Sequence, residues 1–164
     1  METDAYDAAQ SIFRGTFDLA DIVFLIILLF LLLCSALASA SEVAYFSLSP
    51  GELEKLKEKG YDKVANLHQK PNLLLSTILI TNNFVNVGIV ILSTYLVNSL
   101  FDFSGNPVLG FIIQVIGVTS IILLFGEIIP KLYANRSQVK MAIFMAGPLT
   151  FLTYLFPPLS TLLI

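Results

Sequence analysis

The run Ile22-Val23-Phe24-Leu25-Ile26-Ile27-Leu28-Leu29-Phe30-Leu31-Leu32-Leu33 decides the fold class of this chain. It contains no polar side chain, so a helix built from it has no face suited to water. With the small residues that follow, it reaches the roughly 20 residues that a helix needs to cross a bilayer. Acidic residues precede it, and together with the small residues up to about 40 it is longer than the about 7–15 apolar residues of a signal peptide. We predict a membrane-spanning helix at about 21–42.

The composition agrees with a membrane protein. Of the 164 residues, 56% are hydrophobic and only 13% are charged, whereas soluble domains average about 25% charged residues. Two further apolar runs predict spans at about 72–97 and 108–129, joined by a turn-rich loop at 98–107. We therefore expect an all-α membrane protein with three transmembrane helices in a lipid bilayer. No basic patch carries interleaved aromatic residues, so we expect no nucleic-acid partner.

Two segments outside these spans have their own character. Residues 50–70 are charged, with apolar residues at helical spacing, and predict two short juxtamembrane amphipathic helices hinged at Gly60. Ser49 is the expected cap of the first, with Glu52 three residues further on. Residues 139–164 are apolar but contain several prolines. They form either a fourth span or a kinked belt helix in one leaflet, and we prefer the belt because prolines remove backbone donors.

The positive charges predict the orientation. Five of the nine Lys and Arg residues lie at 55–70 and three at 131–140. Both segments should therefore face the cytoplasm. The acidic arm at 1–20 is then extracytoplasmic, which places the N-terminus outside a plasma membrane (the inner membrane of a bacterium). Cys34 lies in an apolar run and His68 in the surface segment, so neither is expected to react or bind metal.

Polar side chains recur inside the predicted spans. Ser35, Ser39 and Glu42 follow each other at i, i+4 and i+7 and share one face of the first helix, whereas Ser41 lies off that face. In the second span, Asn82 and Asn86 are four residues apart, with Asn83 beside them, and the third ends at Gly126-Glu127. To bring these groups together, the ends of spans one and three would have to lie deep in the membrane.

Two interpretations of these groups stay open. Serine and asparagine often join membrane helices by hydrogen bonds. Glu127 could pair with Lys131 or Arg136, and Glu42 could be an interfacial residue or pair with a lysine. Alternatively, hydroxyls, amide carbonyls and one carboxylate together suit a hard cation such as Mg²⁺, Ca²⁺ or Na⁺, and not Zn²⁺ or Cu²⁺. A carboxylate costs about 2.5–3.5 kcal/mol to insert, which favours a use for Glu127. No Ser/His/Asp set exists, so we expect no enzyme.

Three blocks resemble the CorC/CNNM (cyclin M) family of Mg²⁺ transporters. SASEVAYFSLS at 39–49 resembles that family's Ser-Glu-Thr-Ala signature, LLSTILITNNFVN at 74–86 its Asn-Asn block, and FGEIIPK at 125–131 its Phe-Gly-Glu-x-x-Pro-Lys block. They occur in the family's order, and the resemblance covers about 20–164. Val43 stands where the family usually has Thr, and Thr81 where it usually has Gly.

The resemblance implies a homodimeric membrane domain with three spans and a belt helix. Cytoplasmic CBS modules follow this domain in the family, and we expect them to be absent from this sequence. It further implies Mg²⁺ efflux, coupled to Na⁺, through a cytoplasm-facing site. The implied metal ligands are Ser39 or Ser41, Asn82, Asn86, Glu127 and the backbone of Gly126. Some members are described as accessory proteins, for example in bacterial gliding motility, so a non-transporting scaffold or sensor is the alternative function.

Overall fold

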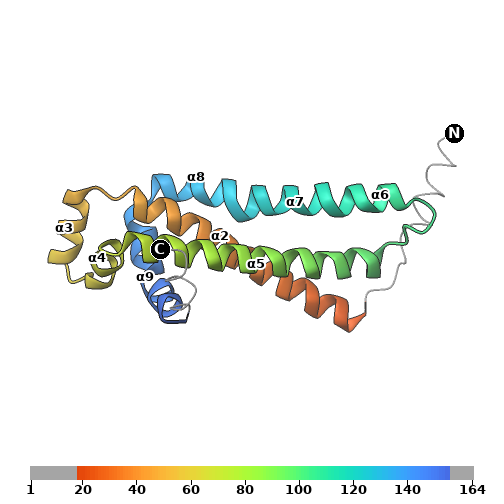
Figure 1. Cartoon of the computed structure of the whole chain (residues 1–164), viewed down its shortest axis with the longest axis horizontal. Helices are drawn as coiled ribbons and strands as arrows, with labels where there is room; N and C mark the ends of the chain where they lie inside the picture. Colours follow the sequence, from red (N-terminus) through yellow and green to blue (C-terminus); the bar gives the residue numbers. More distant parts are fainter. Residues whose placement is uncertain (1–17, 156–164) are drawn as a thin grey trace.

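Three long helices lie side by side in the computed structural model, which describes residues 18–155 (Figure 1). The first is α2, Leu19–Phe46, and the second is α5, Pro71–Leu100. The third is one continuous rod, Pro107–Arg136. Its segments are α6 (Pro107–Ile112), η1 (Ile113–Gly117), α7 (Val118–Ile121), η2 (Ile122–Ile128) and α8 (Ile129–Arg136), where η marks a π-helix.

These three helices are long and apolar enough to cross a membrane, and residues 18–155 contain no strand. The predicted all-α membrane protein with three transmembrane helices is therefore confirmed. The helices run further than we predicted, however. The first continues past 42 to Phe46 and the third past 129 to Arg136. These extra turns lie beyond the polar groups, so the groups meet along the helices and not at their ends.

The two short helices after α2 match the sequence prediction. They are α3, Pro50–Glu58, and α4, Asp62–His68. Ser49 and Glu52 form a reciprocal capping box at the start of α3, and the Ser49 hydroxyl and N–H bonds lower the pKa of Glu52. Between the helices, Gly60 has φ +82°, a left-handed conformation that glycine adopts without strain. The hinge therefore depends on this glycine.

The last described helix, α9 (Gln138–Leu155), contains Pro148 and lies at the α3–α4 end of the bundle. Figure 1 shows it running across the long helices, and it packs against α2, α4 and α5. Its buried side chains join the main apolar core, which includes Ala44, Leu74 and Leu149. Pro157 and Pro158 of the predicted belt lie outside the described residues, as do residues 1–17 of the predicted arm.

A buried tyrosine fastens α9 to α2. Tyr45 is completely buried, and its hydroxyl donates to the carbonyl oxygen of Ala142 at 3.0 Å. Tyr45→Phe should lower the unfolding free energy by about 1 kcal/mol, the usual value of one such hydrogen bond. A thermal unfolding series in detergent measures this loss. Tyr133→Phe is the control, because Tyr133 is 65% exposed. An equal loss in both variants would contradict the assignment.

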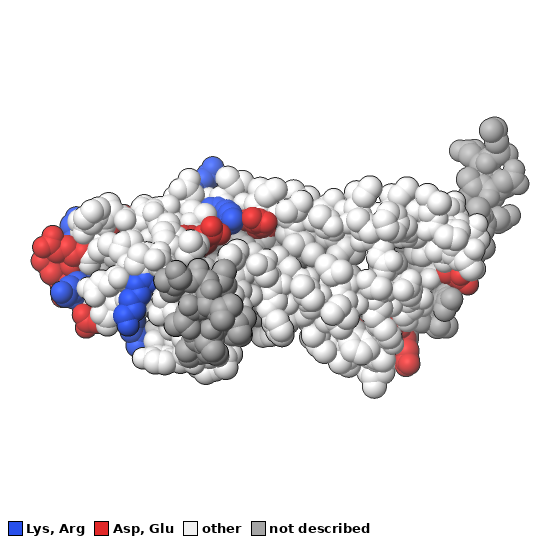
Figure 2. Space-filling view, in the orientation of Figure 1, with Lys and Arg blue, Asp and Glu red and all other residues white. Residues whose placement is uncertain are grey.

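The charges are distributed unevenly along the bundle. All eight Lys and Arg side chains of residues 18–155 lie toward the end formed by α3, α4, α8 and α9, which we call the basic end. At the opposite end, the charged side chains that Figure 2 shows among the described residues are all acidic. There the buried Asp21 accepts a hydrogen bond from Ser99 at 2.7 Å, which ties α2 to α5. Such an asymmetry is typical of membrane proteins whose basic end faces the cytoplasm.

Candidate cation site

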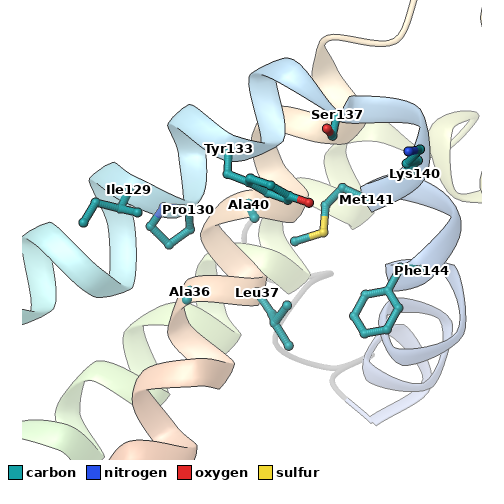
Figure 3. Close-up of a pocket in the computed structure, with 10 residues that line it drawn as sticks. All are labelled: Ala36, Leu37, Ala40, Ile129, Pro130, Tyr133, Ser137, Lys140, Met141 and Phe144. Carbon is teal, nitrogen blue, oxygen red and sulfur yellow. The ribbon is translucent and has the colours of Figure 1, made fainter.

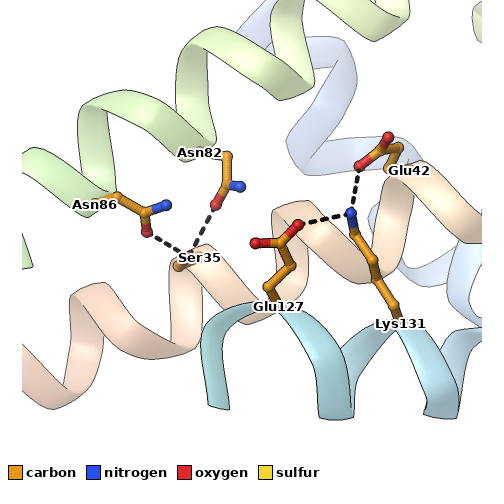
Figure 4. Close-up of polar contacts among 6 residues, drawn as sticks. All are labelled: Ser35, Glu42, Asn82, Asn86, Glu127 and Lys131. Atoms are coloured by element: carbon orange, nitrogen blue, oxygen red, sulfur yellow. Dashed lines mark hydrogen bonds and ion pairs between the residues drawn. The ribbon is translucent and has the colours of Figure 1, made fainter. Parts of the chain in front are cut away.

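A serine of α2 and two asparagines of α5 meet between the long helices. Ser35 is 1% exposed, and its Oγ lies 2.8 Å from Asn82 Oδ1 and 2.7 Å from Asn86 Oδ1 (Figure 4). The two asparagines share a face of α5 because they are four residues apart. Asn83, which lies off that face, is exposed. The structure thus brings the predicted Asn82 and Asn86 together around a residue outside the predicted ligand set.

Three side-chain oxygen atoms converge here, and the only proton lying between them is that of the Ser35 hydroxyl. A serine hydroxyl carries a single proton, so Ser35 can donate to only one of the two amide oxygens at a time. In the other contact, the Ser35 Oγ and an amide oxygen lie less than 3 Å apart with no proton between them. An amide that turns its NH₂ group toward Ser35 satisfies this contact. With both amide oxygens turned toward Ser35, as in Figure 4, the three oxygens also form a set that a cation can contact.

Gly126 brings the backbone of the third rod up to the same serine. A Cβ atom on Gly126 would lie 2.9 Å from Ser35 Oγ, closer than real contacts allow. This close approach explains why a glycine is needed here. Gly126 lies in the π-helical segment η2, and Pro130 follows four residues later. Because proline has no N–H, the Gly126 carbonyl lacks the donor that an α-helix would supply.

Glu127 is engaged with a lysine, as one of our two interpretations proposed. Lys131 Nζ lies 3.0 Å from Glu127 Oε1 on the same rod and 3.2 Å from Glu42 Oε2 on α2. The three side chains are 31–40% exposed, so the protein encloses none of them completely. Figure 4 shows Glu127 between Lys131 and the group formed by Ser35, Asn82 and Asn86. Its carboxylate therefore sits beside both a cationic partner and a set of neutral oxygens.

The two serines proposed as alternative ligands differ in their surroundings. Both are buried, Ser39 at 1% and Ser41 at 0% exposure. Ser41 donates its hydroxyl to Leu37 O of its own helix at 2.6 Å. Ser39 Oγ has no hydrogen-bond partner among the described residues. Ser39 follows Ser35 by one turn on the same face of α2, so its unused hydroxyl is the better placed of the two.

Sequence reasoning missed parts of this site. Ser35 lies on the face predicted for it together with Ser39 and Glu42, but the ligand set implied by the family resemblance does not include it. Its spacing of four residues from Ser39 was the available signal. The two π-helical segments of the third rod had no sequence signal that we used. Thr81, which stands where the family usually has Gly, donates its hydroxyl to Thr77 O within α5, and α2 and α5 remain in contact.

A separate cavity of about 500 Å³ lies between α2, α8 and α9 (Figure 3). Its walls are mostly apolar, with side chains such as Leu37, Ile129 and Phe144. None of the predicted metal ligands lines it, so it is not the site described above. Within residues 18–155, moreover, no three His, Cys, Asp or Glu side chains gather as a metal cluster would require. The candidate site therefore depends on neutral oxygens and few carboxylates.

Three apolar spans around a half-buried cluster of hydroxyl, amide and carboxylate groups define a multi-pass membrane protein with a polar site between its helices. The family model of the cyclin M transmembrane N-terminal domain matches residues 26–164. The chain therefore belongs to the cyclin M transmembrane-domain family, as the three sequence blocks indicated.

Named relatives agree with this assignment. A UPF0053 protein of Haemophilus influenzae is 36% identical over 84% of this chain and 32% of its own length. The metal transporter cnnm-4 of Caenorhabditis elegans is 32% identical over 68% of this chain and 25% of its own length. The UPF0053 inner membrane protein YfjD of Escherichia coli is 30% identical over 72% of this chain and 28% of its own length. The chain thus spans about a third or less of these three relatives.

Proposed function

We propose that this chain is the ion-translocating membrane domain of a Mg²⁺ exporter that uses Na⁺ as its coupling ion. The observation that carries the proposal is the oxygen cluster of Ser35, Asn82 and Asn86 next to Gly126 and Glu127. It offers a cation several neutral oxygens and one carboxylate within the membrane. The relative in Caenorhabditis elegans is named a metal transporter, which supports transport rather than catalysis.

The chemistry of the cluster fits a hard, strongly hydrated ion. Mg²⁺ needs about six oxygens at about 2.0–2.1 Å and gives up its water reluctantly. We assign the ligands to the Asn82 and Asn86 amide oxygens, the Gly126 carbonyl, the Glu127 carboxylate and the hydroxyls of Ser35 and Ser39. Ser41 is set aside because its hydroxyl bonds its own helix. Water would complete the shell wherever a protein oxygen does not reach.

The position of the cluster suits a site entered from the basic end. Asn82 lies eleven residues beyond Pro71, about 16 Å along α5 at 1.5 Å per residue. If the basic end faces the cytoplasm, an ion travels this distance before it meets the asparagines. We therefore infer a cytoplasm-facing site and an N-terminus on the outer side of the plasma membrane. The family resemblance further supports a homodimer.

Paired asparagine variants test the site. Asn86→Ala removes an amide oxygen and should weaken Mg²⁺ binding by roughly tenfold, the lower end of the range for lost support at metal sites. Asn83→Ala is the matched control, because Asn83 lies on the same helix and is exposed. Mg²⁺-dependent thermal stabilisation of the purified chain measures both. Equal effects, or none for Asn86→Ala, would remove the asparagines from the site.

Transport itself requires a flux measurement. The chain is reconstituted in liposomes that contain a Mg²⁺-sensitive dye, with and without a Na⁺ gradient. Flux that depends on Na⁺ and falls in Asn86→Ala supports the proposed exporter. A folded protein that gives no flux supports the alternative, a membrane scaffold or sensor in which Ser35 and the asparagines only join α2 to α5.

A further inference from the structure

Lys131 is held between two carboxylates that belong to different helices. Its Nζ lies 3.0 Å from Glu127 Oε1, four residues earlier on its own rod, and 3.2 Å from Glu42 Oε2 on α2 (Figure 4). Among the described residues it is the one basic side chain for which ion pairs within 4.0 Å are seen. One ammonium group thus serves two carboxylates at once.

This arrangement conflicts with a metal at Glu127. A divalent cation on the Glu127 carboxylate would stand close to the Lys131 ammonium, and like charges at such distances repel. The Lys131 ammonium must therefore move away from Glu127 when the cation binds. It can do so without disturbing the core, because its side chain is 31% exposed and sits on a flexible stem. It also needs no new partner, since Glu42 is already within contact distance.

We propose that Lys131 is a displaceable internal counter-ion of the cation site and that Glu42 is its second acceptor. Without a metal, the ammonium neutralises Glu127. When Mg²⁺ binds Glu127, the ammonium is retained by Glu42 alone. Glu42 is then a positioning residue that never touches the metal. This inference rests on the proposed function, because it assumes that Glu127 is a ligand.

A double-mutant cycle on Mg²⁺ affinity tests the idea. Lys131→Met removes the competitor and should tighten Mg²⁺ binding by roughly fivefold or more, a typical size for coupling between sites. Glu42→Gln leaves the ammonium with Glu127 alone and should weaken binding by a similar factor. In the Lys131→Met background, Glu42→Gln should have almost no effect, since no lysine remains to be positioned.

Each alternative gives a different result. If Glu42 were a metal ligand, or attracted the metal only through its negative charge, Glu42→Gln would weaken Mg²⁺ binding equally in the wild type and in Lys131→Met. If Lys131 merely supported the fold, Lys131→Met would weaken binding. Either result overturns the inference while the proposed function stands. A wild-type chain that binds no Mg²⁺ overturns both the proposed function and this inference.

A control variant at the basic end and a substitute for Lys131→Met complete the experiment. Lys140→Met, on α9, removes an exposed lysine for which no ion pair is seen among the described residues, and should leave the Mg²⁺ affinity unchanged. Lys131→Gln replaces Lys131→Met if the apolar variant fails to fold, because it also removes the charge. Affinity is measured by calorimetry with MgCl₂ alone, and size-exclusion chromatography reports whether each variant is folded.

Discussion

Glu127→Gln should abolish the Mg²⁺ response of this chain. The substitution keeps the size of the side chain and removes the one carboxylate assigned as a metal ligand. Partners in the outer shell of metal sites already contribute 10–100-fold to affinity, so losing this direct, charged ligand should cost roughly 100-fold or more. Mg²⁺-dependent thermal stabilisation and dye-reported flux in liposomes should both disappear.

The stability of the metal-free protein separates this effect from misfolding. Glu127 and Lys131 are 38% and 31% exposed, and exposed ion pairs contribute about 0–1 kcal/mol. Glu127→Gln should therefore melt close to the wild type when Mg²⁺ is absent. Glu54→Gln on α3 is the matched control, because it removes an exposed carboxylate far along the chain from the site. A Mg²⁺ response that survives in Glu127→Gln would exclude Glu127 as the ligand.

Gly126→Ala should disrupt both packing and the site. Its new Cβ would lie 2.9 Å from Ser35 Oγ and 3.5 Å from Ser35 Cβ. Ser35 cannot easily move away, because it is buried and fixed against Asn82 and Asn86. Overpacking of this kind costs about 1–3 kcal/mol. The helices must separate slightly, and Mg²⁺ binding should weaken beyond detection at concentrations that saturate the wild type.

Two further variants make this prediction specific. Gly117→Ala on the same rod meets no atom within 4 Å and should be tolerated. Combining Gly126→Ala with Ser35→Ala removes the hydroxyl that clashes and leaves an ordinary contact of the new Cβ with the Ser35 Cβ. This double variant should regain thermal stability but not Mg²⁺ binding. If Gly126→Ala alone behaves like Gly117→Ala in thermal unfolding and Mg²⁺ titration, the close approach of Gly126 to Ser35 is needed neither for stability nor for Mg²⁺ binding.

Much of the fold was predictable because it depends on local physics. The unbroken apolar run of α2, the cap at Ser49 and the hinge at Gly60 each act over a few residues. The helix ends were predicted less well. Glu42 and Pro130 looked like boundaries, yet the helices continue past both. A charge can lie inside a membrane helix when another helix neutralises it, and Lys131 does so for Glu42. The sequence offered a lysine as a partner of Glu42, but which lysine it is depends on how α2 packs against the third rod.

The candidate site was predictable to a similar degree. The spacing of Asn82 and Asn86 identified their shared face, and the family blocks pointed to Gly126 and Glu127. Sequence spacing could not show that Ser35 stands opposite both amides. Nor could it separate Ser39 from Ser41, because that distinction depends on which hydroxyl already has a partner. These relations belong to the packing of α2 against its neighbours.

The spacing of Glu127 and Lys131 also bears on how the third helix enters the bilayer during biosynthesis. A lone carboxylate or ammonium group is costly in hydrocarbon. These two groups are four residues apart and form their ion pair within one helix. The segment can therefore leave the translocon with its charge already compensated, before α2 supplies Glu42. Separating the pair by moving the lysine two positions along the helix would penalise membrane insertion itself, even in a chain that never meets a metal ion.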